Sequence, residues 1–91
     1  MTSEQAETIA LQALAFLVKD EVLLNQFLTN SGLTPQDLKT SFREPDFLGG
    51  VLDAMLADDA LLLSFCNTMS LSPETLVMAR KVLPGWIESV D

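Results

Sequence analysis

The segment SGLTPQDL, residues 31–38, returns as MSLSPETL, residues 69–76, so that the second copy begins 38 residues after the first. Each copy places a hydroxyl residue directly before a proline, as Thr34-Pro35 and Ser72-Pro73. Threonine and serine are favoured N-caps of helices, and proline is favoured at the first helical position. Both segments therefore predict the end of one helix and the start of the next.

Apolar residues recur at helical spacing on both sides of these two segments. The run from Ile9 to Val18 is apolar around most of its circumference, which is typical of a helix that is contacted from several sides. Asp20 and Asp58 are expected to cap further helices, and Pro45 is expected to break the chain between the two halves. No window shows the strict alternation of a strand, so we predict an all-α fold, a compact bundle of about six helices.

The repeat extends beyond the two quoted segments. A shift of 38 residues without gaps superimposes apolar core positions and caps, pairing Leu14 with Leu52, Asp20 with Asp58, Phe27 with Phe65, Leu33 with Leu71 and Leu38 with Leu76. We predict a single domain over residues 1–91, made of two tandem three-helix units at 9–42 and 47–80, followed by a C-terminal tail at 84–91. The short third helix of the first unit is expected to bury Leu38 and Phe42.

The combination of ALAFL, SGLTPQDL, PDFL and LSPE along this chain resembles a family of short bacterial, mostly alphaproteobacterial, proteins known as domain of unknown function 3572. The most specific parts of the resemblance are Gly-Leu-Thr-Pro at 32–35 and Asp-Asp-Ala-Leu-Leu-Leu at 58–63. The resemblance covers nearly the whole chain, and it implies membership without any catalytic or binding residue to carry over. The chain departs from the pattern at Gly49-Gly50, where small helix formers such as alanine are expected.

Charge excludes several classes of partner. The chain has 13 acidic and 5 basic residues, a formal net charge of -8, and its basic residues form no stripe. Nucleic acid and anionic membrane surfaces repel such a chain, because binding to them begins with Lys and Arg replacing counterions. The second and third expected helices, joined by Asn30-Ser31-Gly32-Leu33, resemble a helix-turn-helix in outline, but the later of the two carries Gln36, Asp37 and Lys39, so we expect no DNA binding.

The cysteine count and the amino-terminal sequence indicate the cellular compartment of the protein. The single cysteine, Cys66, suits a reducing compartment. The apolar run at 9–18 is too short to span a bilayer and follows acidic rather than basic residues. We therefore expect a cytoplasmic protein that does not bind membranes.

The absence of histidine, together with the repeat, argues against catalysis. Triads that depend on histidine and imidazole metal ligands are both excluded. The acidic pair Asp58-Asp59 has Asp20-Glu21 as its counterpart, which favours a helix cap with a first-turn acid rather than a catalytic or metal site. The counterpart of Cys66 is Leu28, so we interpret this thiol as part of the core. We expect no enzymatic activity and no cofactor; a polar cluster around Asp53 and Asp58-Asp59 would favour an enzyme instead.

Four residues remain as candidates for partner contact: Gly49, Gly50, Trp86 and Ile87. A glycine pair inside a helix marks either a place where a ligand or partner backbone comes close, or a structural feature. The structural interpretation, which we favour, is close helix packing or a helix that starts only after the pair. Trp86 and Ile87 either anchor a partner or close the core of the domain itself.

The function that these features favour is a non-enzymatic protein-interaction module, including the case in which the chain binds a second copy of itself. Its partner is unidentified, and a charged partner is expected to be basic. The alternative is a carrier that holds a small apolar ligand in a pocket between the two helical units, with the first helix lining that pocket.

Overall fold

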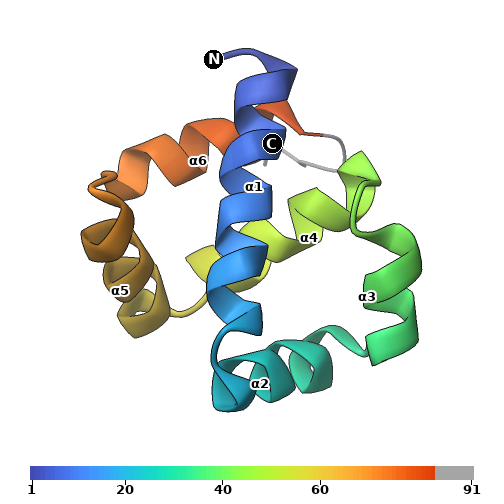
Figure 1. Cartoon of the computed structure of the whole chain (residues 1–91). Coiled ribbons are helices and arrows are strands. Elements are labelled where there is room, and N and C mark those ends of the chain that lie inside the picture. The colour runs from blue at the N-terminus through green and yellow to red at the C-terminus, as the bar shows by residue number, and fades with distance from the viewer. Residues whose placement is uncertain (84–91) are drawn as a thin grey trace, which may run out of the picture.

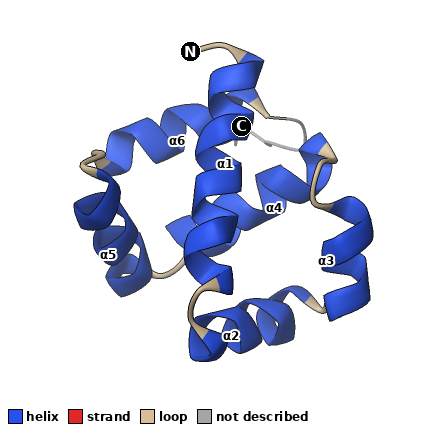
Figure 2. Cartoon of the chain, viewed as in Figure 1, coloured by secondary structure: helices blue, strands red, loops and turns tan. Residues whose placement is uncertain are grey.

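The computed structural model describes residues 1–83, and within this range the chain forms six helices and no strand (Figures 1 and 2). The predicted all-α bundle of about six helices is therefore confirmed. The helices are α1 (Ser3–Val18), α2 (Glu21–Ser31), α3 (Pro35–Ser41), α4 (Pro45–Leu56), α5 (Asp59–Met69) and α6 (Pro73–Val82).

Helix starts follow the capping residues of the sequence. Asp20 accepts hydrogen bonds from the backbone N–H groups of Val22 and Leu23, and Asp58 accepts one from Leu61. Three further helices begin at hydroxyl caps, namely Thr2 for α1, Thr34 for α3 and Ser72 for α6. The predicted caps are thus confirmed, and each satisfies N–H groups that a helix start leaves without an intrahelical partner.

Helix α1 is central, as its apolar circumference predicts, and it packs against α2, α4 and α6 (Figure 1). Small side chains line the packed face of α1, because Ala6, Ala10 and Ala13 are completely buried together with Leu17. Alanine at this spacing lets neighbouring helices approach closely. Phe65 of α5 closes the core from one side and meets the ring of Phe16 edge-on at 5.4 Å between centroids.

Some of the helix boundaries in the two halves fall at the spacing of the sequence repeat, whereas the starts of α1 and α4 and the ends of α3 and α6 do not. Helices α2 and α5 both contain 11 residues, and both end at a residue in the left-handed conformation, Gly32 with φ 75° and Ser70 with φ 56°. Helices α3 and α6 both begin at a proline that follows a hydroxyl cap. The duplication of a three-helix unit stays a prediction.

The third helices of the two halves pack differently. Helix α6 lies against α1 and α4, and its Leu76 and Ala79 are completely buried. Helix α3 contributes no buried residue. The expectation that Phe42 is buried is wrong: its side chain is 37% exposed, and the guanidinium of Arg43 lies over its ring at 5.2 Å from the centroid.

Substitutions at the two left-handed positions should change stability in opposite directions. Gly32→Ala should destabilise the fold by about 1 kcal/mol, because a Cβ is disfavoured at positive φ. Ser70→Gly should stabilise the fold, since glycine has no Cβ and adopts a positive φ without the strain that serine has there. Urea unfolding followed by circular dichroism measures both changes, and a destabilised Ser70→Gly variant would contradict the assigned conformation.

Candidate functional site

Gly50 is an exposed glycine inside a helix, and none of residues 1–83 packs on it. Helix α4 begins at Pro45, so both glycines of the pair lie within it, and the interpretation that the helix starts after the pair is wrong. Gly49 is buried, whereas Gly50 is exposed. A Cβ built on Gly50 would meet no atom of the described residues within 4 Å, so close packing among the six helices does not explain this residue either.

A cleft of about 360 Å³ opens beside Gly50, on the side of the molecule where α2, α3 and α4 meet (Figure 1). We call it the α2–α4 cleft. Its lining residues are Phe27, Ser31, Leu33, Ser41, Glu44, Asp46, Phe47 and Gly50.

Aromatic rings form the apolar part of this lining. Phe27 of α2 and Phe47 of α4 are largely buried, and their rings meet edge-on, with centroids 6.4 Å apart and an interplanar angle of 83°. Leu33 adds an apolar side chain from the turn before α3. The carboxylates of Glu44 and Asp46 are exposed, so the cleft combines an apolar floor with an acidic rim.

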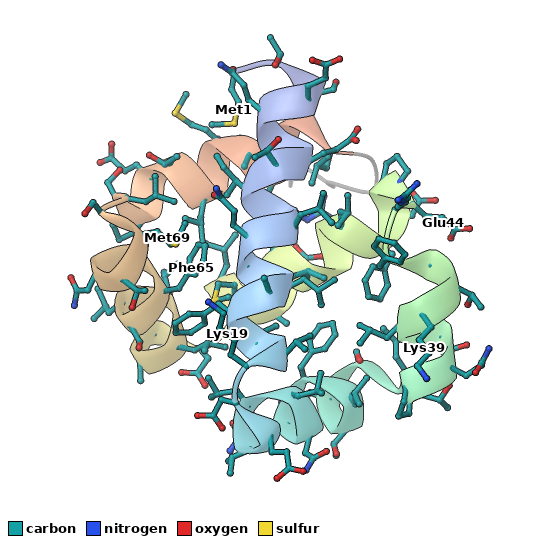
Figure 3. All side chains as sticks on the ribbon, in the orientation of Figure 1. Met1, Lys19, Lys39, Glu44, Phe65 and Met69 are labelled. Carbon is teal, nitrogen blue, oxygen red and sulfur yellow. The ribbon has the colours of Figure 1, made fainter. Side chains whose placement is uncertain are left out.

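Helix α3 packs less closely on the core than α6 does: its Leu38 lies half-buried against the core, and none of its residues is fully buried. Ser41 of α3 lines the cleft, while Ala79, 38 residues later in α6, is completely buried against the core. Figure 3 shows Glu44 at the corner between α3 and α4, with Lys39 on α3. The carboxylate of Glu44 makes no capping hydrogen bond at the start of α4.

A larger hollow, of about 590 Å³, runs along the start of α1. Among residues 1–83, those that line it all come from positions 1–9. It brings no distant parts of the chain together, and we do not treat it as a site.

The other acidic and thiol groups have structural roles. Asp58 caps α5, as predicted, and Asp59 lies in the first turn of that helix. Cys66 is 3% exposed and lies in the core, as predicted, and burial raises the pKa of its thiol. A raised pKa disfavours the reactive thiolate. Among residues 1–83, no group of three or more potential ligands from His, Cys, Asp and Glu is placed to hold a metal ion.

Asp53 joins α4 to α6 through a buried arginine. The guanidinium of Arg80 donates from Nε to Oδ1 of Asp53 at 2.6 Å and from Nη2 to Oδ2 at 3.1 Å. It also donates from Nη1 to the backbone carbonyl of Leu83 at 3.3 Å. The Arg80 side chain is 5% exposed and that of Asp53 53% exposed. This bidentate pair fixes the end of α6 onto α4.

Two of the four predicted contact residues, Trp86 and Ile87, lie outside the described residues. Of the other two, only Gly50 belongs to the cleft. Sequence reasoning missed Phe27, Glu44 and Phe47 as parts of a site, because their pattern is that of ordinary core and helix-start residues. The signal that could have found them is the glycine in the middle of a clean apolar stripe.

A comparison with family models assigns the chain to a family. The model described as "Protein of unknown function (DUF3572)" matches residues 3–86, so the chain belongs to this family, as the resemblance in its sequence implies. No curated protein and no solved structure matches the chain significantly. None of the helices within residues 1–83 combines the length and the apolar character that crossing a bilayer requires.

Removing either partner of the Arg80–Asp53 pair should have unequal effects. Asp53→Ala should cost about 1–3 kcal/mol, because the buried guanidinium loses its two hydrogen bonds to this carboxylate. Arg80→Met should cost less, since methionine fills the same space and the half-exposed Asp53 can be hydrated. Urea unfolding of both variants and of the double variant tests this; a larger loss for Arg80→Met would show that the pair does not work as described.

Proposed function

We propose that this member of the DUF3572 family is a non-enzymatic docking domain, which binds a segment of a partner protein in the α2–α4 cleft. The observation that carries the proposal is Gly50, an exposed helical glycine with empty space around its missing side chain. Glycine in a helix interior costs about 0.5–1 kcal/mol relative to alanine. At Gly50, no packing among residues 1–83 offsets this loss of helix stability, and the cleft is open beside the glycine.

The lining of the cleft suits a protein segment. Large apolar side chains anchor most peptide segments that bind in grooves, and the exposed parts of Phe27, Phe47 and Leu33 offer such an anchor a surface to cover. The polar rim, with Ser41 and Glu44, offers hydrogen-bond acceptors beside this surface. An apolar anchor with polar neighbours is the usual composition of a peptide docking site.

A carrier of a small apolar ligand fits the same cleft less well. Such ligands are held in pockets that enclose most of their surface, and this cleft is not enclosed by the residues that the structure describes. Helix α1, which the carrier hypothesis places along the pocket, contributes no residue to the lining. We also propose the cytoplasm as the compartment, because a single buried thiol suits reducing conditions.

Filling the cleft should abolish binding without unfolding the protein. Gly50→Leu places an apolar side chain in the empty space, and leucine has a higher helix propensity than glycine. We expect proteins captured by the wild-type chain from cytoplasmic extract to be retained about ten-fold less, or not at all, by this variant. Mass spectrometry of both captures provides the measurement.

The matched control is Ser64→Leu, which adds the same side chain to an exposed position of α5. It should retain the captured proteins at the wild-type level, and circular dichroism should show all three proteins folded. If Gly50→Leu and Ser64→Leu capture the same proteins in the same amounts, the α2–α4 cleft is not the docking site.

A further inference from the structure

On the basis of the proposed docking function, we infer that the occupant of the α2–α4 cleft is a basic peptide segment, with a large apolar side chain next to Lys or Arg. The charges of the cleft indicate the chemistry of this partner.

The cleft carries negative charge and no positive charge of its own. Glu44 and Asp46 line it, and no Lys or Arg does. Neither carboxylate forms an ion pair with any residue in the range 1–83. Arg43, the nearest cation along the chain, lies with its guanidinium over the ring of Phe42.

The two carboxylates differ in whether the helix already uses their negative charge. Asp46 lies in the first turn of α4, where an acid also serves to balance the positive end of the helix dipole. Glu44 is the N-cap residue of α4, yet its side chain makes no capping hydrogen bond, unlike the caps of the other five helices in residues 1–83. Its charge is therefore available to a partner.

Apolar and acidic surfaces meet within one cleft, so a matching occupant combines an apolar side chain with a cation. The apolar side chain would cover the Phe27–Phe47 floor, and the cation would reach the carboxylate of Glu44 at the rim. Complementary charge of this kind raises association rates and selects among partners.

Charge also argues against three other occupants. A second copy of this chain carries a net charge of -8, and nucleic acid is likewise anionic. The chain's own residues 84–91, PGWIESVD, contain Glu88 and Asp91 and no Lys or Arg. Each of these would bring negative charge to a negative rim.

The test begins with a displayed library of random short peptides, selected on the immobilised full-length chain. Peptides that also bind Gly50→Leu are removed by counter-selection. We expect the remaining peptides to carry Lys or Arg next to Leu, Phe or Trp. Fluorescence polarisation then measures the affinity of these peptides for further variants of the chain.

Glu44→Gln should weaken these peptides about 2- to 5-fold, the range for an exposed ion pair. Glu74→Gln, which removes the same charge from the exposed first turn of α6, should leave their affinity unchanged. Raising NaCl from about 0.05 M to about 0.5 M should weaken binding to the wild-type chain and reduce the difference made by Glu44→Gln.

The two levels of the proposal fail in different ways. Peptides that depend on Gly50 but are neutral or acidic would overturn the inference about charge and leave the docking function standing. Basic peptides that bind wild type and Glu44→Gln equally would do the same. If no peptide depends on Gly50, the docking function itself is wrong, and the inference falls with it.

Discussion

The close packing of α1 against α4 and α6 is the constraint on which the rest of the structure depends. Completely buried alanines on α1 bring these helices together, and Leu17 fills the space where they meet. The pair between Arg80 and Asp53 then holds α6 on α4 from the other side. With these three helices in place, α2 and α5 cover the ends of the core, and Phe65 seals the side next to α5.

The same constraint leaves α3 at the edge of the core, which it contacts through the half-buried Leu38. Helix α6 covers one surface of α1 and α4, so α3 cannot pack there. None of the seven residues of α3 is fully buried. The core accordingly ends at Phe27 and Phe47 on this side, and a cleft remains above them. A side chain at Gly50 would cover this surface, but glycine leaves it open at a cost in helix stability. The candidate site is thus a consequence of unequal packing in two halves whose helix boundaries match in part.

The sequence correctly predicted those features that depend on residues close to one another in the chain. Asp20, Thr34, Asp58 and Ser72 are caps in the structure because capping depends on neighbouring backbone groups, and helical periodicity placed α1 at the centre. Burial of Cys66 followed from its counterpart in the repeat. Packing between helices could not be predicted: Leu38 packs half-buried against the core, whereas Phe42, one turn further along α3, is exposed. The sequence marked Gly50 as a candidate contact residue but could not show the space beside it, since that space depends on the packing of the surrounding helices.

The central claim is that Gly50 leaves the cleft open at the expense of helix stability, and the free energy of unfolding of Gly50→Ala tests it most directly. No partner is needed for this measurement, which uses urea unfolding of the wild-type chain and the variant. Because a Cβ at this position meets no atom of the described residues within 4 Å, the account predicts that alanine stabilises the fold by about 0.5–1 kcal/mol. A destabilised Gly50→Ala variant would show that the glycine is required by packing, and would contradict the account.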